Sequence, residues 1–336
     1  MTKVKAISLL SGGLDSLLAA RVVQDQGVEV LALHFISPFF GSALRGKERE
    51  AEELYLENFG IKARVVDVSE EYLGVVGEPR YGYGKNFNPC IDCKIFLFKK
   101  ALEVMRQEGA KFLITGEVLG QRPMSQRRDT LNIIARDMGE GDILLRPLCA
   151  KLLKPTRAEE EGWVDREKLY GFSGRSRKPQ MALAEELGIA GYPSPAGGCS
   201  LTDPIQAKRM SKYFEATPAE RRSPGDIRLL LAGRPFRFPG GSILTLGRNE
   251  GENKFLMSLK GEGDEFVRVL GAPGPLGVFR AADGADEREL AASALLRYCP
   301  KAADVAQVAF ADTPDKEGVV VEVSRPSEEE LEGWRA

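Results

Sequence analysis

The sequence predicts an α/β fold, in which a doubly wound parallel sheet is followed by a smaller α+β domain. In the first half of the chain, short apolar runs alternate with helical patterns, which is typical of βαβ units. The first apolar run leads directly into a glycine-rich turn and a helix. The chain has 336 residues, enough for two domains, and its composition changes after Asp203-Pro204. We therefore expect domains at residues 1–203 and 204–336.

The expected strands are short segments rich in apolar residues, because strands of a parallel sheet are covered on both faces. These strands are Val4–Leu10, Val28–Phe35, Lys62–Val68 and Phe112–Thr115. The stretches between them carry helical periodicity and predict the helices Leu17–Gln26, Gly46–Phe59 and Ile95–Glu108. Glycine, proline and polar residues predict loops at Glu78–Pro89, Gly171–Lys178 and Pro193–Gly198, and a short helix at Gln180–Leu187 ends before Gly188.

Composition excludes several classes of protein. The net charge of −2 gives no general attraction to nucleic acid, so any RNA binding must come from a local patch. No apolar run approaches the roughly 18 residues of a membrane span, and we expect no signal peptide before the first strand. The 5 cysteines are odd in number and unevenly spaced, which argues against a disulfide framework and for a reducing cytoplasm.

The turn after the first strand carries the strongest indication of chemistry. It consists of Ser11, Gly12, Gly13, Leu14, Asp15 and Ser16. Two glycines allow the backbone to approach an anion, and the free N–H groups at a helix start favour a phosphate there. Asp15 suits this place if it holds Mg²⁺. The simpler alternative is a serine-glycine turn that only caps a helix.

This hexapeptide resembles the SGGxDS motif of the PP-loop, or N-type, ATP pyrophosphatases. It lacks the Gly-Lys-Ser/Thr ending of the nucleotide-triphosphatase loop. The resemblance implies cleavage of ATP between the α and β phosphates and adenylation of a substrate oxygen. Ligands of doubly wound sheets bind at the carboxyl ends of the strands. Ser11, His34 and Gly116 fall at such ends and are expected to share one cleft.

Three of the cysteines lie where loops expose a thiol. Cys90 and Cys93 form a CxxC pair at a helix start, and Cys199 follows Gly197-Gly198. Such a pair can bind a metal or form a redox disulfide. Three thiolates suit an iron–sulfur cluster with one open iron, or a catalytic persulfide with a resolving thiol. The simpler alternative makes Cys199 a small buried residue. Cys149 and Cys299 have no such context and are expected to be structural.

Further segments resemble the tRNA 4-thiouridine synthases. They are Leu33–Phe40, Thr115–Gln121, Ser125-Gln126, Leu131-Asn132 and Arg146-Pro147-Leu148, in the order of that family. The resemblance implies that His34, Phe35, Thr115, Gly116 and Gln121 bind ATP. Asn88-Pro89-Cys90-x2-Cys93 looks like the corresponding segment of the tRNA 2-thiouridylases. The set of Cys90, Cys93 and Cys199 resembles the thiolases that hold a [4Fe–4S] cluster on three cysteines.

The sequence departs from the 4-thiouridine synthases at two places. We expect no counterpart of the ferredoxin-like and THUMP region that precedes their PP-loop, and Arg122-Pro123-Met124 interrupts a family segment. Which uridine is modified, and at which oxygen, therefore stays open.

The second domain contains a segment that is similar to the NFACT-R module of RNA-associated proteins. That segment spans residues 236–259, within a stretch rich in basic residues. These are Lys208, Arg209, Lys212, Arg221, Arg222, Arg228, Arg234, Arg237 and Arg248. They predict RNA binding, with a solvated surface as the alternative. In the first domain, the expected tRNA guides are Arg127, Arg128, Lys151, Lys154, Arg175, Arg177 and Lys178.

The combined hypothesis is an ATP-dependent tRNA sulfurtransferase. Asp15, Cys90, Cys93 and Cys199 are its candidate catalytic residues, and the three cysteines are its candidate metal ligands. ATP, Mg²⁺ and a [4Fe–4S] cluster are the expected cofactors. The expected partners are tRNA and a sulfur donor, either sulfide or a cysteine desulfurase persulfide. Two alternatives are a PP-loop ligase or amidotransferase on a small substrate and a non-catalytic RNA-binding module. The sequence does not indicate the oligomeric state.

Overall fold

The computed structural model describes residues 3–192, 199–316 and 318–336. The chain divides into two compact units, Met1–Asp203 and Pro204–Ala336. The loop expected at Pro193–Gly198 lies outside the described residues.

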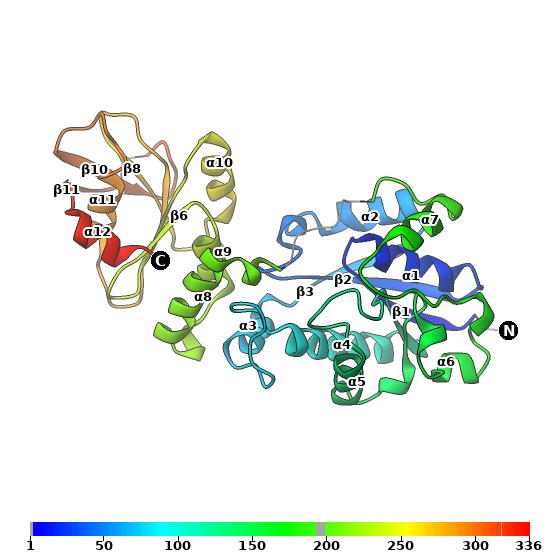
Figure 1. Ribbon diagram of the computed structural model, residues 1–336. Coiled ribbons are helices and arrows are strands. Elements are labelled where there is room, and N and C mark those ends of the chain that lie inside the picture. Colours follow the sequence, from blue (N-terminus) through cyan, green and yellow to red (C-terminus); the bar gives the residue numbers. More distant parts are fainter. Residues whose placement is uncertain (1–2, 193–198, 317) are drawn as a thin grey trace. The chain divides into compact units, whose positions relative to one another are not determined.

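The first unit is built on a parallel five-stranded sheet with the order β3-β2-β1-β4-β5. Its strands are β1 Lys5–Leu10, β2 Glu29–Ile36, β3 Lys62–Asp67, β4 Phe112–Thr115 and β5 Leu144–Leu145. Its α-helices are α1 Leu14–Gln24, α2 Glu48–Phe59, α3 Ser69–Gly77, α4 Cys90–Gln107, α5 Arg128–Asp137, α6 Arg157–Glu160 and α7 Lys178–Glu186. Helices α1, α2 and α7 cover one face of the sheet and α3, α4 and α5 the other (Figure 1). The expected doubly wound fold is confirmed.

The strand order places β1 at the centre of this unit. Its residues Ala6 and Ile7 are fully buried, and so are Leu17 and Leu18 of the helix that follows. Register along the sheet pairs Leu10 with His34 and Leu9 with Thr115. The carboxyl ends of β1, β2 and β4 are therefore level with one another, and the segments that leave these strands start from one edge.

Two helices begin earlier than the apolar pattern predicts. Helix α1 begins at Leu14 rather than Leu17, and α4 begins at Cys90 rather than Ile95. The first turn of a helix at a functional edge carries polar residues, so its apolar period starts later than its backbone geometry. Cys90 and Cys93 consequently lie within the first turns of α4. Helices α3 and α5 were not expected from the sequence at all.

The second unit has an antiparallel six-stranded sheet with the order β11-β10-β8-β9-β7-β6. Its strands are β6 Arg234–Arg237, β7 Ile243–Leu246, β8 Glu265–Val269, β9 Gly277–Arg280, β10 Val305–Ala311 and β11 Val319–Ser324. Its helices are α8 Pro204–Ala216, α9 Pro224–Leu231, α10 Glu250–Leu259, α11 Arg288–Leu296 and α12 Glu328–Trp334. Helix α11 packs its alanines and leucines against Phe279 and Phe310 in one core. This is the α+β architecture expected for the second half.

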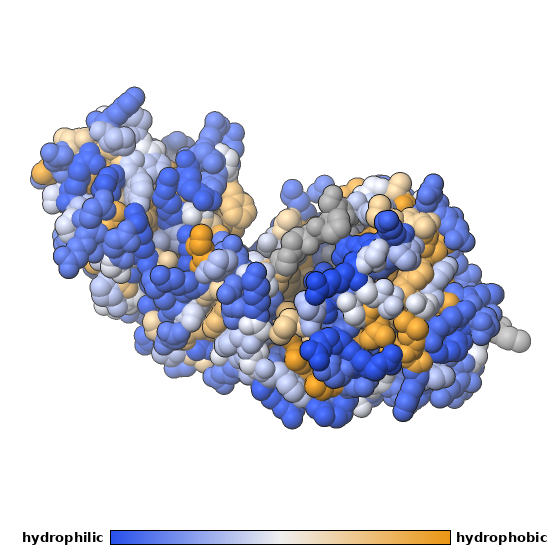
Figure 2. All heavy atoms as spheres, in the orientation of Figure 1, coloured by the Kyte–Doolittle hydropathy of each residue, from blue (hydrophilic) through white to orange (hydrophobic). Residues whose placement is uncertain are grey.

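In the described part of the chain, no helix combines the length and the apolar character needed to cross a bilayer. On the face drawn in Figure 2, hydrophilic side chains predominate in both units, and exposed apolar side chains form separate small patches.

Candidate functional site

The turn between β1 and α1 has the geometry of an anion-binding loop. Gly12 adopts a φ of +73°, a conformation that favours glycine, and Gly13 is the N-cap of α1. Ser16 and Leu17 donate their backbone N–H groups to the carbonyl of Gly13 at 3.1 and 3.3 Å, and the N–H groups that precede them lie at the helix start, where no helical acceptor exists. Together with the helix dipole they favour a negatively charged group at this place.

Ser16 holds the shape of this loop. Its hydroxyl donates to the carbonyl of Gly13 at 2.7 Å and accepts from the backbone N–H of Ser11 at 3.2 Å. The Ser11 hydroxyl lies 3.3 Å from the Ser16 hydroxyl. Both hydroxyl groups thus lie on the loop as expected, but Ser16 is engaged inside the loop and fixes its backbone.

Gly116 brings the end of β4 into direct contact with the start of α1. A Cβ atom at this position would lie 2.4 Å from the carbonyl oxygen of Asp15 and 2.6 Å from the backbone nitrogen of Ser16. Only glycine allows this approach without a shift of backbone. Thr115 and Gly116 therefore border the anion-binding loop, where the resemblance placed them.

His34 lines the loop from β2 and is the only histidine of the chain. It is buried, and its Nδ1 lies 2.9 Å from the hydroxyl of Tyr55 on α2. A Cβ atom at Gly12 would lie 3.0 Å from that hydroxyl and 3.6 Å from the His34 ring. Burial lowers the pKa of His34 to about 4, so the ring is neutral near pH 7. Phe35, the next residue, is buried in the sheet.

Asp15 is held by a chain of amide groups that the sequence did not predict. Gln180 on α7 donates to Gln121 at 2.9 Å, and Gln121 donates to Oδ2 of Asp15 at 2.6 Å. Arg177 lies 3.7 Å from the same oxygen, although the sequence suggested it as a tRNA guide. The other oxygen, Oδ1, is buried and has no hydrogen-bond partner. An orphaned carboxylate oxygen beside an anion-binding loop is a fitting ligand for Mg²⁺.

Several hydrogen bonds bring the loop before Cys90 to the segment that contains Cys199. Asn86 donates its side-chain amide to the carbonyl of Thr202 at 2.7 Å, and Phe87 donates its backbone N–H to Leu201 at 3.3 Å. Ser200 donates to the carbonyl of Phe39, just beyond β2, at 3.2 Å. Asp92, inside the CxxC pair, accepts from the backbone N–H groups of Arg80 and Tyr81. Cysteines that are far apart in sequence therefore lie in one region.

The pKa values show that the three cysteines influence one another. Burial raises the pKa of Cys93 to about 12, and the hydrogen bond from Tyr72 and the charge of Lys94 oppose this rise. The thiolates of Cys199 and Cys90 raise the pKa of Cys93 further. Burial also raises the pKa of Cys90 and of Cys199. The thiols are therefore protonated near pH 7 unless a cation stabilises their thiolates.

Cys90, Cys93 and Cys199 fit a [4Fe–4S] cluster, because they supply thiol ligands and lie in one region of the unit. Such a cluster is held by cysteine thiolates, and its charge would offset the effect of burial on the three pKa values. Within residues 3–192, 199–316 and 318–336, no three histidine, cysteine or acidic side chains are already arranged as a metal site. Cys90, Cys93 and Cys199 are all free and only partly exposed.

A buried ion cluster connects the cysteines to the end of β4. Glu117 is almost fully buried and pairs with Arg146 at 3.0 Å and with Lys94 at 3.4 Å. Lys94 directly follows Cys93, and Glu117 directly follows Gly116. Cys149 donates its thiol to the carbonyl of Glu117 at 3.3 Å, deep in the unit. Sequence reasoning missed the roles of Glu117 and Lys94, because nothing in their local pattern shows that they meet.

Several of the cations proposed as tRNA guides are engaged within the first unit. Arg128 donates to the carbonyl of Leu152, Lys151 binds Glu167, and Arg127 pairs with Asp129. The carboxylates of Asp129 and Glu167 offset the charges of Arg127 and Lys151, whereas Arg128 donates to a neutral carbonyl and keeps its charge.

Comparisons with known proteins match both parts of the chain. Residues 1–152 match the family model described as thiamine biosynthesis protein (ThiI), and residues 233–335 match the NFACT protein RNA binding domain. The second match extends well beyond the segment of residues 236–259 that carried the resemblance. Both resemblances stated from the sequence are confirmed.

Among curated proteins, a probable tRNA sulfurtransferase of Thermococcus kodakarensis is 32% identical over 140 residues, covering 40% of this chain and 35% of that protein. The tRNA-specific 2-thiouridylase MnmA of Petrotoga mobilis is 30% identical over 138 residues, covering 35% of this chain and 36% of that protein. The chain thus spans about a third of the length of these relatives. A crystal structure of a 4-thiouridine synthetase–RNA complex with bound ATP superposes with a TM-score of 0.35 at 22% identity, over 55% of this chain and 51% of that one.

Replacing Gly116 with alanine should destabilise the first unit by roughly 1–3 kcal/mol, because the new methyl group overlaps the Asp15–Ser16 backbone. It should also weaken ATP binding. Urea unfolding and calorimetric titration with ATP measure the two effects. Gly74→Ala is the matched control, since a Cβ atom there meets nothing within 4 Å. Equal behaviour of the two variants would show that the close approach at Gly116 is unimportant.

Protonation of His34 should destabilise the protein in acid. Its pKa is about 4 in the folded protein and 6.5 in the unfolded chain. Between pH 4 and pH 6.5 the unfolded chain therefore binds more protons than the folded protein. Stability therefore falls as the pH falls from about 6.5 to about 4, by roughly 3 kcal/mol for this group. Urea unfolding at pH 7 and pH 4 should show a correspondingly larger loss for the wild type than for His34→Gln. Equal losses would contradict a buried neutral ring.

Proposed function

We propose that this chain uses ATP to replace a carbonyl oxygen of uridine in tRNA with sulfur, releasing AMP and pyrophosphate. The observation that supports this most directly is the link between the two parts of the site. Gly116 packs on the anion-binding loop, Glu117 follows it and binds Lys94, and Lys94 follows Cys93. The ion pair between Glu117 and Lys94 therefore connects the proposed ATP-binding edge of the sheet to the segment that carries Cys93.

In this proposal the loop from Ser11 to Ser16 binds the pyrophosphate part of ATP. The N–H groups at the start of α1 donate to phosphate oxygens, and the dipole of α1 stabilises the charge that develops as pyrophosphate leaves. Asp15 holds Mg²⁺ through Oδ1, while Gln121 keeps Oδ2 in place. The ends of β2 and β4, with His34 and Thr115, border the nucleoside.

The first reaction is adenylation. A uracil carbonyl oxygen attacks the α-phosphorus of ATP, the bond to the β-phosphate oxygen breaks, and pyrophosphate leaves. The carbonyl oxygen becomes part of an AMP group, which leaves far more readily than oxide or hydroxide. Hydrosulfide sulfur can then add to the same carbon and expel AMP. The product has a C=S bond in place of C=O.

Cys90, Cys93 and Cys199 form the sulfur-handling part of the site and would hold a [4Fe–4S] cluster. When bound, such a cluster supplies an iron with a free coordination position for sulfur. Tyr72 and Lys94 contribute a hydrogen bond and a positive charge that favour the Cys93 thiolate. The sulfur donor is sulfide or a cysteine desulfurase persulfide, and a persulfide releases its outer sulfur as hydrosulfide only when two thiols supply two electrons and become a disulfide. The free thiols favour the reducing cytoplasm as the compartment of the reaction. The unit Met1–Asp203 carries the chemistry and Pro204–Ala336 binds RNA.

Incubation with ATP and unmodified tRNA should yield AMP and pyrophosphate, because the loop lacks the lysine of ADP-forming nucleotide-triphosphatases. Asp15→Asn should lower the rate by roughly 100-fold or more, since it removes a charged ligand of the metal–pyrophosphate group. Chromatography of labelled nucleotides measures the products. Asp25→Asn, at the exposed far end of α1, is the matched control and should keep the rate. Formation of ADP and phosphate would contradict the proposal.

Alanine at Cys90, Cys93 or Cys199 should abolish thiolation and remove iron, because a cluster on three cysteines loses a ligand in each case. Adenylation should persist in all three variants, since ATP binds at the loop. Protein purified without oxygen is assayed for iron, and thiouridine in tRNA is measured by mass spectrometry. Cys149→Ala and Cys299→Ala are controls that should retain iron and activity. Iron-free wild-type protein with unequal variants would favour a persulfide, and full thiolation by Cys199→Ala would overturn both sulfur schemes.

A further inference from the structure

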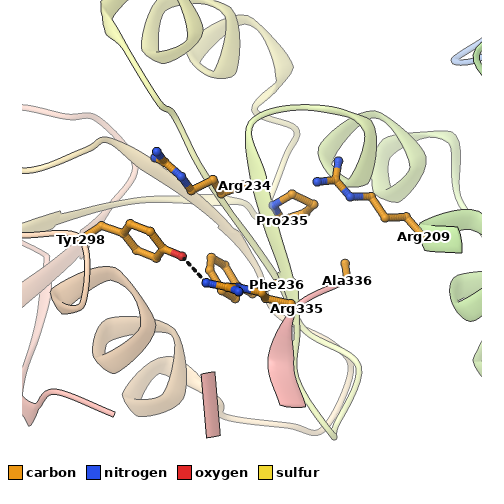
Figure 3. A pocket seen from close by; sticks show the side chains of 7 residues that line it. All are labelled: Arg209, Arg234, Pro235, Phe236, Tyr298, Arg335 and Ala336. Atoms are coloured by element: carbon orange, nitrogen blue, oxygen red, sulfur yellow. Dashed lines mark hydrogen bonds between the residues drawn. The ribbon is translucent and has the colours of Figure 1, made fainter. Parts of the chain in front are cut away.

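The second unit contains a pocket of about 260 Å³ whose lining includes 3 arginines (Figure 3). The lining residues are Arg209, Arg234, Pro235, Phe236, Tyr298, Arg335 and Ala336. The arginines come from three different elements, since Arg209 lies on α8, Arg234 opens β6, and Arg335 follows α12. No acidic side chain belongs to the lining. This concentration of positive charge stands out in a chain whose net charge is −2.

Arg335 is oriented before any ligand arrives. Its guanidinium donates to the hydroxyl of Tyr298 at 3.4 Å, the interaction drawn in Figure 3, and also pairs with Glu332 of α12. Its backbone is fixed as well, because its carbonyl accepts from Lys212 at 3.1 Å and it bridges Phe236 of β6. A side chain that is already positioned loses little conformational entropy when it binds a ligand.

Arg234 and Arg209 also have contacts within the second unit. The guanidinium of Arg234 lies over the ring of Tyr298, 4.9 Å from its centroid. Arg209 donates to the carbonyl of Leu230 on α9 at 3.4 Å. An aromatic ring positions a guanidinium without cancelling its charge, so the stacking on Tyr298 orients Arg234 and leaves it attractive to an anion.

Three other arginines of the basic stretch also have partners within the second unit. Arg222 donates to the carbonyls of Phe214 and Thr217 at the end of α8. Arg237 donates to the hydroxyl of Thr217, and Arg248 pairs with Glu252. The pocket thus combines two members of the stretch with Arg335, which the sequence did not suggest.

We propose that this pocket binds a backbone phosphate of RNA. Guanidinium groups match the geometry of phosphate oxygens and bind them through paired N–H donors. The volume of about 260 Å³ lies below the roughly 300–1,000 Å³ of pockets that enclose a whole small molecule, so the site suits one group of a larger chain. The match of residues 233–335 to an RNA-binding domain favours RNA as the source of that phosphate. The inference rests on the proposed function, the thiolation of tRNA. It adds that the arginine pocket of the second unit anchors the tRNA by one backbone phosphate.

The test compares full-length variants in binding to an unmodified tRNA transcript over a range of salt concentrations. The double variant Arg234→Gln/Arg335→Gln should bind roughly tenfold more weakly at about 0.15 M salt. The slope of log K against log salt should flatten by about 0.7–0.9 for each phosphate that the variant no longer binds. The matched control Arg288→Gln/Lys254→Gln removes two charges that pair with Glu265 and Glu250, which do not line the pocket, and should change neither value.

Tyr298→Phe provides a second variant that keeps every charge of the pocket. It removes the hydroxyl that orients Arg335, and should weaken tRNA binding by a smaller factor than the double variant. Thermal unfolding confirms that the variants are folded. Unchanged tRNA affinity and salt slope in the folded double variant would overturn the proposal, and so would weakening of the same size in the control.

Two further outcomes separate this inference from the proposed function. Titration with inorganic phosphate at millimolar concentration, measured by ³¹P NMR, shows whether the protein binds free phosphate. Binding of phosphate that requires Arg234 and Arg335, with tRNA affinity unaffected by their substitution, would overturn RNA as the ligand.

The rate of AMP formation separates the pocket from catalysis. If the double variant still forms AMP with saturating tRNA but has a reduced affinity for it, the pocket serves as an anchor while the catalytic proposal stands. Wild-type protein that forms no AMP but binds tRNA through these arginines would contradict the catalytic proposal alone.

Discussion

The close approach between the backbones of Gly116 and the Asp15–Ser16 peptide is the constraint on which the first unit's site depends. A side chain at Gly116 would come within 2.4 Å of the Asp15 carbonyl oxygen, so the exit of β4 is seated directly on the start of α1. This approach fixes the next residue, Glu117, at a depth where its carboxylate must find cationic partners. Those partners, Arg146 and Lys94, belong to the segments that follow β5 and that carry the cysteines. One close approach of backbone therefore sets the distance between the phosphate loop and the thiols.

The polar groups around the loop differ in how fully they are satisfied. Glu117 is enclosed with two cations, and removal of either would leave its buried carboxylate with a single counterion, which destabilises the unit. His34 is kept neutral and bonded to Tyr55. Asp15 has one oxygen bound by Gln121 and one left buried without a partner. Because this oxygen lies beside an anion-binding loop, it marks where a cation would complete the set of interactions.

The strands of the first unit could be predicted well because parallel strands are continuous apolar runs, and Val4–Leu10 differs from β1 by only one residue at its start. Helix starts were less accurate, since polar residues occupy the first turns of α1 and α4. The loop from Ser11 to Ser16 was identified because its chemistry is local in sequence. Gln180, Lys94 and Glu117 could not be found in this way, because they act through partners between 23 and 59 positions distant. The carbonyl groups that engage Arg222 could not be found for the same reason, since only its charge is visible in the sequence.

Helix α7 has a consequence for where the first unit can be shortened. The family match ends at residue 152, yet Gln180, on a helix that packs against α1, supplies the hydrogen bond that holds Gln121 against Asp15. A chain cut after residue 152 would retain every segment of the matched family and still lack one end of this relay. It would also expose the apolar face of α1 that α7 covers. The boundary of a sequence family and the boundary of an independently folding piece therefore fall at different residues, and expression of the first unit has to extend at least through α7.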